Sequence, residues 1–533
     1  MKIKFLSFAF LMTLSFGTLL SQKYVVPASM KATGYDAHVE LTFDNPNAFI
    51  YDIYVSKDGG KNFIRRVETN GDFYLDFVND LGRNLSLLYR IVPKGMNVHD
   101  KDAAKFQVKA QTHVFSDDEL INMVQQYTTR YFFNFADPDC GMARERNNNP
   151  NGDIVTTGGT GFGIMALIAA DHRGYYPHQA IFQKIDQIVT FLEKADRFHG
   201  AWAHWYNSHT GKVFNFSKYD DGGDLVETAF MMQGLLTARQ YYQNGDDQER
   251  SLCQRITKLW EGVDWNWYTQ GTDSLYWHWS PDYGFKINHR ITGFDETMIT
   301  YVLAASSPTH PIRPEVFKSY SISSYFYNGK SYFGIPLALG MPYGGPLFFC
   351  HYSFLGMNPH GLMDKNANYW VLNRNHVLIQ RAYAIANPKH ERGLGQNCWG
   401  FTASDDPMDG YSTHQLGTNE ENGTVSPTAA LASLPYAPKE ILPVYRHFYY
   451  DLGKKIFGPY GFYDAFNLGM VDGQQVVHSY LAIDEGPIPV MIENYRSALL
   501  WNLFMSNTEI QTGLKKLGFQ FDATYQNEKP SVQ

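Results

Sequence analysis

Cysteine is scarce in this chain of 533 residues, and its spacing speaks against one common kind of site. Only Cys140, Cys253, Cys350 and Cys398 occur, and none of them forms a CxxC pair of the kind that binds zinc. One or two disulfides and four buried free thiols are both compatible with this spacing. The cysteines therefore predict no metal site and fix no cross-link.

Basic tracts and the short motifs of several enzyme classes are also missing. The formal net charge is −8 and no run of lysine and arginine occurs, which argues against nucleic acid as a partner. The patterns GxSxG, P-loop and HExxH are absent, so serine-hydrolase, nucleotide and zinc-protease chemistry find no support. We expect no cofactor and no metal. Four histidines lack metal-ligand spacing and are expected to be hydrogen-bonding residues of a pocket: His204, His209, His278 and His289.

A long apolar run occurs at the N-terminus. Residues 1–21, "MKIKFLSFAFLMTLSFGTLLS", have two lysines, an apolar stretch and then small and polar residues. This pattern is typical of a secretory signal peptide and is too short for a membrane span. No cysteine follows it, so we expect no lipid anchor. The sequence predicts a periplasmic or secreted protein without a membrane span.

Aromatic residues, in contrast, are abundant, at 16% of the chain. They gather with histidine in "WAHWYNSH" (202–209), which contains Trp205, and in "LYWHWSPDYGF" (275–285), without a helical period. Large aromatics dominate many apolar cores, but irregular loops that mix rings with polar groups also suit the flat faces of sugars. We favour a carbohydrate-binding site for these two stretches.

Residues 22–111 have the pattern of a small all-β domain. Short runs such as "HVELTF", "FIYDIYVS", "FIRRVE", "FYLDFV", "LSLLYRIV" and "KFQVKA" are separated by turn signals such as "DGG" and "NGD". Six or seven strands in about ninety residues predict an antiparallel sandwich of the fibronectin type III kind. No catalytic pattern stands out in this region, and we expect it to be a spacer or a support.

Residues 112–533 are predicted to be mainly helical. "SDDEL" is a capping box, with Ser116 as the cap and Glu119 reaching back, and it begins an amphipathic helix through Phe135. Six apolar runs start near residues 158, 222, 293, 366, 423 and 484, and amphipathic segments such as 178–198 and 439–457 lie between them. An inner and an outer set of helices predict an (α/α)6 toroid.

Acidic residues stand where these apolar runs begin. Glu227 in "GGDLVETAF" follows a glycine pair, and Asp224 could cap the helix with Glu227 as the third helical residue. Burial would raise the pKa of Glu227, as a general acid requires, whereas the helix N-terminus would lower it. Capping and substrate contact are both open for Glu296, after Asp295, and for Glu485, after Asp484.

Four stretches together resemble a known family. "WGFTASDDPMDG" (399–410), "GGDLVETAF" (222–230), "GMARER" (141–146) and "AIDEGPI" (482–488) are similar to those of the bacterial glucoamylase-like family that includes glycoside hydrolase family 144. The resemblance covers residues from about 116 to the C-terminus. It implies an (α/α)6 fold and an inverting hydrolase of β-1,2-glucan, acting within chains or releasing sophorose from chain ends.

The resemblance also implies roles for particular residues. Glu227 resembles the general acid and Asp405 is the candidate base. Neighbours in an extended segment point in opposite directions, so Asp405 and Asp406 are not expected to face the same water. Asp406 precedes Pro407 and suits the start of a turn. The remaining residues expected to contact or support the substrate are Arg144, Glu145, Trp205, Glu296, Trp399, Asp406, Glu421 and Glu485.

Two other classes of function fit parts of the pattern. A glycan-binding protein without catalysis would also carry many surface aromatics, and a polysaccharide lyase could use tyrosine and histidine on the same kind of toroid. A glucoamylase acting on another glycan is a further alternative. We expect a monomer acting on a β-glucan. The sequence leaves the oligomeric state, the choice between exo and endo action and the product length open.

Overall fold

The structure is a computed structural model that describes residues 26–149 and 152–521. The signal peptide expected at residues 1–21 lies outside the described residues. The chain divides into two compact units, of which the first ends at Val114 and the second begins at Phe115. The predicted boundary, after residue 111, stands three residues earlier.

The first unit is made of antiparallel strands, as its alternating pattern predicts. In the described residues one sheet has the order β1-β2-β5 and another the order β4-β3-β6-β7. The bounds are β1 (Met30–Gly34), β2 (His38–Phe43), β3 (Tyr51–Ser56), β4 (Ile64–Thr69), β5 (Phe73–Phe77), β6 (Ser86–Pro93) and β7 (Gln107–Gln111), with a 3-10 helix at Lys101–Phe106.

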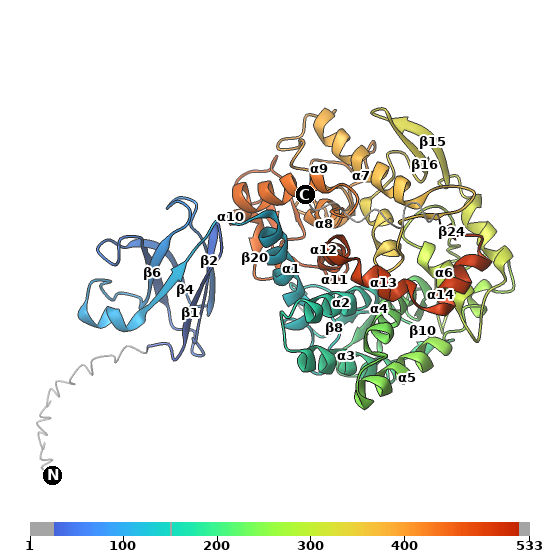
Figure 1. The fold of residues 1–533 in the computed structure, drawn as a ribbon, viewed down its shortest axis with the longest axis horizontal. Helices are drawn as coiled ribbons and strands as arrows, with labels where there is room; N and C mark the ends of the chain where they lie inside the picture. Colours follow the sequence, from blue (N-terminus) through green and yellow to red (C-terminus); the bar gives the residue numbers. More distant parts are fainter. Residues whose placement is uncertain (1–25, 150–151, 522–533) are drawn as a thin grey trace, which may run out of the picture. The chain divides into compact units, whose positions relative to one another are not determined.

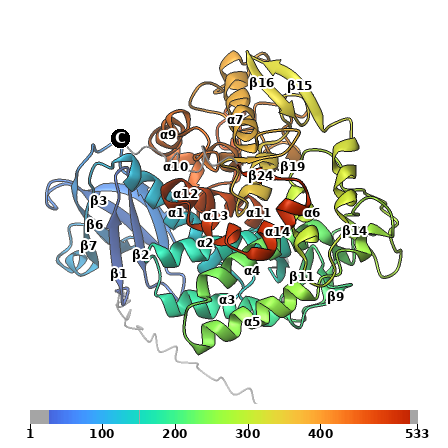
Figure 2. The ribbon, with the colours of Figure 1, turned by 45° about the vertical axis from the view of Figure 1, so that its right-hand side comes forward.

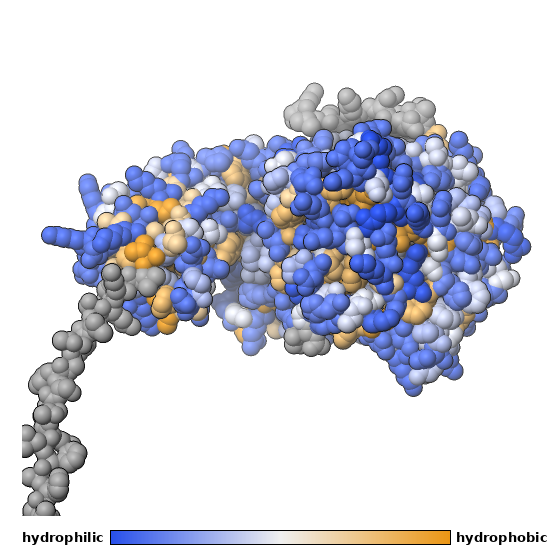
Figure 3. Space-filling view, turned by 90° about the horizontal axis from the view of Figure 1, so that it is seen from below, coloured by the Kyte–Doolittle hydropathy of each residue, from blue (hydrophilic) through white to orange (hydrophobic). Residues whose placement is uncertain are grey.

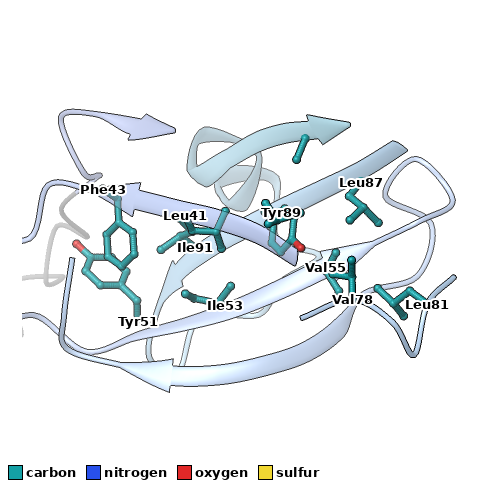
Figure 4. Packing of buried hydrophobic residues seen from close by; sticks show 12 residues of the cluster. Leu41, Phe43, Tyr51, Ile53, Val55, Val78, Leu81, Leu87, Tyr89 and Ile91 are labelled. Atoms are coloured by element: carbon teal, nitrogen blue, oxygen red, sulfur yellow. The ribbon is translucent and has the colours of Figure 1, made fainter. Parts of the chain in front are cut away.

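Both sheets contribute to one apolar core (Figure 4). Leu41 of β2 lies among Ile53 of β3 and Ile91 of β6, and these side chains are fully buried. Alternate residues of each strand point to this core because successive side chains of a strand face opposite sides. The same alternation explains why the strand pattern could be read from the sequence.

The second unit is rich in helices (Figure 1). Their bounds are α1 (Asp117–Phe133), α2 (Thr157–His172), α3 (His178–Leu192), α4 (Leu225–Tyr242), α5 (Asp247–Glu261), α6 (Met298–Ser306), α7 (Tyr369–Ala386), α8 (Pro427–Leu431), α9 (Pro438–Arg446), α10 (Gly453–Ile456), α11 (Ala482–Glu485), α12 (Pro487–Ser497), α13 (Leu499–Met505) and α14 (Thr508–Lys516). Figures 1 and 2 show α3 and α5 at the rim of this unit and α2 and α4 nearer its middle.

The predicted start of α1 is confirmed, whereas several other predicted helices are shorter than expected. Ser116 and Glu119 form both bonds of a capping box. Helix α3 ends at Leu192 because Arg197 and Phe198 pair with Ala201 and Trp202 in a hairpin. The run from residue 423 gives only the short α8, and the segment 439–457 is broken by a π-helical turn at His447–Asp451.

Helices α2 and α4 pack with almost no space between their backbones. An added side-chain carbon at Gly161 would lie 2.3 Å from the carbonyl oxygen of Phe230. A carbon at Gly234 would lie 2.1 Å from the carbonyl oxygen of Gly161. Only glycine permits such a close approach at these positions. The beginnings of the two helices are therefore held close together, and Glu227 lies at the beginning of α4.

Short strands hold the loops at the starts of these helices. Strand β11 (Trp205–Asn207) pairs with β8 (Ile154–Thr156), which leads directly into α2. Strand β13 (Gly223–Asp224) pairs with β14 (His278–Trp279), and β18 (Ala403–Asp406) forms a hairpin with β19 (Gly410–Thr413). The aromatic stretches of the sequence are thus partly ordered by these strand pairs.

Three properties of the described residues bear on the earlier expectations. All four cysteines fall within the described ranges and none forms a disulfide. Across residues 26–149 and 152–521 no helix is long and apolar enough to cross a membrane. The face shown in Figure 3 is mainly hydrophilic, with apolar residues in small groups.

Candidate active site

Helix α4 begins with two acidic residues that have different tasks. Asp224 is the N-cap, and its Oδ1 accepts hydrogen bonds from the backbone N–H groups of Val226 and Glu227. The side chain of Glu227 instead reaches helix α2, where Oε2 accepts a 2.6 Å hydrogen bond from the N–H of Gly158. A side-chain carbon at Gly158 would lie 2.6 Å from this oxygen. The carboxyl of Glu227 is therefore not the cap of its own helix.

Burial dominates the electrostatics of Glu227. The residue is only 7% exposed, and this burial raises its pKa to about 7. The positive charge of His204 lowers the pKa of Glu227, and the negative charge of Asp224 raises it further. A carboxyl with a pKa near neutrality keeps its proton in the pH range where a general acid has to donate it. Of the two opposing effects expected from the sequence, desolvation is the larger.

Two histidines and two aspartates surround the start of α4. His204 Nδ1 lies 3.1 Å from Asp224 Oδ2, and His278 Nε2 lies 3.4 Å from Asp220 Oδ2. One imidazole nitrogen of His204 and one carboxylate oxygen each of Asp220 and Asp224 lie within 4.8 Å of one another, which is close enough for them to bind a metal ion together. The shortest of these contacts is, however, a hydrogen bond that needs a proton on the imidazole. Ion pairing between histidine and aspartate accounts for the group as it stands.

The adjacent carboxylates of β18 point in different directions, as expected for neighbours in a strand. Asp406 ties its own turn to a second segment: Oδ1 accepts from the N–H groups of Met408 and Asp409, and Oδ2 accepts from the side chains of Asn422 and Thr424. These hydrogen bonds lower its pKa against the effect of burial. Asp406 therefore fixes the turn, and the expected contact with substrate does not fit it.

Asp405 faces a cation that comes from a distant part of the chain. Arg146 Nη1 donates to both carboxylate oxygens of Asp405, at 3.0 and 3.1 Å, and Arg146 Nε donates to Glu145 at 2.8 Å. The guanidinium thus bridges the two carboxylates through charge-assisted hydrogen bonds. Burial still raises the pKa of Glu145, because that effect exceeds the effect of Arg146.

Further buried carboxyls lie behind Asp405. Asp464 Oδ2 accepts a 2.6 Å hydrogen bond from the backbone N–H of Asp405. Burial and then the charge of Asp405 raise the pKa of Asp464 to about 7, and burial raises the pKa of Asp484 and Glu485 well above their usual range. Tyr352 donates its hydroxyl to Asp484 at 3.2 Å. Neutral carboxyls here can support Asp405 without adding negative charge.

The two carboxyls have different surroundings. Burial raises the pKa of Glu227 to about 7, as a general acid needs, and Asp405 accepts hydrogen bonds from the Arg146 guanidinium. This geometry supports hydrolysis assisted by two carboxyls.

Comparison with known proteins identifies the family. A family model described as "Putative glucoamylase" matches residues 288–508, and one described as a protein of unknown function matches residues 125–261. The chain is 40% identical, over 92% of its length and 70% of the relative's, to an exo β-1,2-glucooligosaccharide sophorohydrolase (non-reducing end) of Parabacteroides distasonis. The chain belongs to glycoside hydrolase family 144.

Solved structures of similar proteins cover most of the chain. An endo-β-1,2-glucanase from Chitinophaga pinensis, in complex with sophorotriose and glucose, is 50% identical with a TM-score of 0.74 over 76% of this chain and 99% of that one. A β-1,2-glucanase from Parabacteroides distasonis is 38% identical with a TM-score of 0.84 over 93% of this chain and 73% of that one. The second match extends over more of this chain than the first.

Trp399 and Glu421, which were expected to contact or support the substrate, lie in the protein interior. Trp399 is 0% exposed, so neither face of its ring is open to a sugar. Glu421 is 1% exposed and accepts hydrogen bonds from the hydroxyl of Tyr383 and the N–H of Gly423, with Lys389 Nζ at 3.3 Å. Neither side chain is open to direct contact with a sugar, because a sequence motif does not report which of its side chains are buried; a supporting role stays a prediction for both.

Three other expected residues lie in surroundings compatible with a site. Arg144 donates to the carbonyl oxygen of Phe135, and its guanidinium lies over the Phe135 ring. Trp205 is half-buried and its ring lies 4.8 Å from that of Phe216, which is exposed. Glu296 is half-buried in the loop before α6, where burial raises its pKa and Glu227 is among the charges that act on it.

Sequence reasoning missed two residues beside Asp405. Asp464 stands in "GFYDAF", where nothing local distinguishes it from a turn residue. Tyr411 is directly opposite Asp405 in the β18–β19 hairpin and is 52% exposed. Directly opposed residues of an antiparallel pair lie on the same face of the sheet. The hairpin turn after Asp406 could have pointed to Tyr411, whereas only the folded chain brings Asp464 to Asp405.

Proposed function

We propose that this protein hydrolyses β-1,2-glucan with inversion at the anomeric carbon. The observation that carries the proposal is the contrast between Glu227, buried with a pKa of about 7, and Asp405, which is paired with Arg146, in a chain whose relatives are named for this substrate. Glu227 protonates the oxygen of the leaving sugar. Asp405 takes a proton from the water that attacks the anomeric carbon.

The proposal includes the architecture that would hold these residues. The helix-rich unit is an (α/α)6 toroid whose inner helices include α2, α4 and α6, and the β-rich unit is a sandwich of the fibronectin type III kind. Two antiparallel sheets on one core and apolar helices flanked by amphipathic ones support this arrangement. We further propose an exported monomer that needs no metal.

A substrate comparison tests the function. The purified protein is incubated with β-1,2-glucan, laminarin, starch and cellulose, and soluble products are separated by chromatography. Oligosaccharides from β-1,2-glucan alone are the expected result. Products from starch alone would make the enzyme a glucoamylase, unsaturated products absorbing in the ultraviolet would make it a lyase, and binding without products would make it a glycan-binding protein.

A second measurement distinguishes exo from endo action, because the named relatives include both kinds. Viscosity of a β-1,2-glucan solution is followed together with the release of reducing ends. Early loss of viscosity identifies internal cleavage. Release of one small product at nearly constant viscosity identifies cleavage from chain ends.

A further inference from the structure

The ring of His204 lies between the cap of α4 and the carboxyl of Glu227. Its Nδ1 lies 3.1 Å from Asp224 Oδ2 and 3.8 Å from Asp220 Oδ2, and its Nε2 lies 3.9 Å from Glu227 Oε1. The ring of Phe216 stacks on the imidazole at 4.3 Å between centroids. Both nitrogens thus face carboxyl groups, and the plane of the ring is held in place.

The surroundings keep a proton on both nitrogens of this ring. Burial by itself lowers the pKa of His204, but its carboxyl neighbours Glu227, Asp220 and Asp224 outweigh it and raise that pKa well above its ordinary value. While Glu227 holds its proton, Asp224 and Asp220 at Nδ1 are the carboxylates that stabilise the imidazolium. An imidazolium donates from both nitrogens and carries a positive charge. His204 is therefore a cation at neutral pH.

We propose that His204 is a positioning residue that holds a positive charge against Glu227 Oε1 and stabilises the carboxylate that remains after Glu227 has given up its proton. The inference rests on the proposed function, because it takes Glu227 as the acid. In that step the O–H bond of Glu227 breaks and a new O–H bond forms on the leaving sugar oxygen. The electron pair stays on the carboxylate, where Gly158 supports Oε2 and His204 supports Oε1.

The loop before α4 is built for this arrangement. Oδ1 of Asp224 caps the helix that carries Glu227, and Oδ2 accepts a hydrogen bond from the Nδ1–H of His204. The backbone at His204, between Trp202 and β11, is fixed as well, since the carbonyl oxygen of His204 accepts a hydrogen bond from the N–H of Thr157 at the start of α2. The imidazole and the carboxyl of Glu227 are thus anchored to the same two helices.

The remaining charges around this pair make a cation useful. Asp224 and Asp220 act on Glu227 so as to raise its pKa, in the same direction as burial. Without His204 the carboxylate formed in the reaction would face mainly negative groups. The other titratable groups that interact with Glu227 or His204 are Asp220, Asp224, Glu145 and Glu296. His278, His289 and Tyr268 interact in turn with Asp224.

Two substitutions of His204 test the role. His204→Asn keeps an N–H donor near the Nδ1 position toward Asp224, and His204→Gln places one near Nε2. Both remove the positive charge. His310→Gln, at an exposed histidine in the loop after α6, is the control. Rates on β-1,2-glucan are measured from pH 5 to 9, and each variant is checked by thermal melting.

The expected result is a displaced pH profile. Loss of the cation raises the pKa of Glu227, so the pH above which the rate falls should move upward by about one unit in both His204 variants. The maximal rate should fall by about 10-fold, because a weaker acid transfers its proton less readily. His310→Gln should leave both the profile and the maximal rate unchanged. An unmoved profile in a folded His204 variant overturns the inference.

A double variant shows whether His204 acts through Glu227. If it does, adding His204→Gln to Glu227→Gln should cost little beyond the effect of Glu227→Gln alone. A further 10-fold loss in the double variant would overturn the inference, since His204 would then act by another route. The proposed function fails separately, when the unaltered protein releases no product from β-1,2-glucan.

Discussion

Glu227 and Asp405 are both almost completely buried carboxyls, yet their neighbours differ in kind. Glu227 has a backbone N–H at 2.6 Å and its nearest cationic nitrogen at 3.9 Å, whereas Asp405 has both oxygens within 3.1 Å of the Arg146 guanidinium. Burial therefore raises the pKa of Glu227 to about 7, whereas Asp405 is held in an ion pair with Arg146. The type of neighbour, a backbone N–H or a guanidinium, distinguishes the proposed acid from the proposed base.

The same contrast holds between Asp405 and its neighbour Asp406. Asp405 faces a guanidinium on one side of the β18 strand, and Asp406 accepts hydrogen bonds from its own turn on the other. Adjacent identical side chains thus differ because a strand sends them to opposite faces. Substitutions of Glu227, Asp405 and Asp406 should therefore separate effects on catalysis from effects on stability.

The largest effect is expected for the substitution Glu227→Gln. It keeps the shape of the side chain and removes the transferable proton, so kcat should fall by at least about 10²-fold. At pH 5 the melting temperature should change little, because an amide then replaces a protonated carboxyl and Asp224 caps the helix. Kinetics and thermal melting are measured together. The control is Glu421→Gln, which changes a buried glutamate outside the site and should reduce stability while activity is retained. If Glu227→Gln loses stability but keeps full activity, Glu227 has only a structural role.

Asp405→Asn and Asp406→Asn compare the two faces of β18. Asp405→Asn should lower kcat by about 10²-fold, since an amide cannot take a proton from water. Asp406→Asn should retain activity and lose about 1–3 kcal/mol of unfolding free energy, because hydrogen bonds to a buried carboxylate are lost. Rates and denaturant unfolding are measured for each. The reverse pattern would move the base to Asp406.

The pH dependence follows from the pKa of Glu227. As pH rises through about 7 the acid loses its proton, and the rate should fall by about 10-fold per unit above that value. The free energy of unfolding also falls as pH rises. Because the pKa of Glu227 in the folded chain lies above its ordinary 4.5, protonation favours the folded chain at low pH, and this contribution is lost between pH 4.5 and about 7. The melting temperature of Glu227→Gln relative to the unaltered protein should therefore increase from pH 4 to pH 8. A constant difference would contradict the assignment.

The smallest effect is expected from the pair Tyr411→Ala and Trp399→Phe. Exposed Tyr411 shares a face with Asp405, so its truncation should raise KM several-fold with little change in stability. Trp399 is buried, and its replacement should cost about 1–3 kcal/mol in unfolding free energy while KM stays the same. Steady-state kinetics on β-1,2-glucan give KM, and denaturant unfolding gives the free energy of unfolding. A change of KM in Trp399→Phe alone would restore its expected role at the substrate.

Local patterns in the sequence were sufficient for much of the fold. The alternation of "HVELTF" predicts β2 at its observed bounds, and Ser116 with Glu119 predicts the start of α1. Each of these elements is decided by residues close together in the chain, through pleating or capping. The position of Glu227 at the start of a buried helix was equally visible, because glycines and an acidic cap precede an apolar run.

Tertiary structure decided what these residues do. Arg146 and Asp405 are 259 residues apart, Glu227 and Gly158 are 69 apart, and no local pattern contains either contact. Burial of Trp399 depends in the same way on which segments cover it. The pKa of a carboxyl depends on desolvation and on charges within a few ångströms, and both are set by the folded chain. The sequence by itself therefore determined which residues are acidic and where helices begin, and the fold determined which acid keeps its proton.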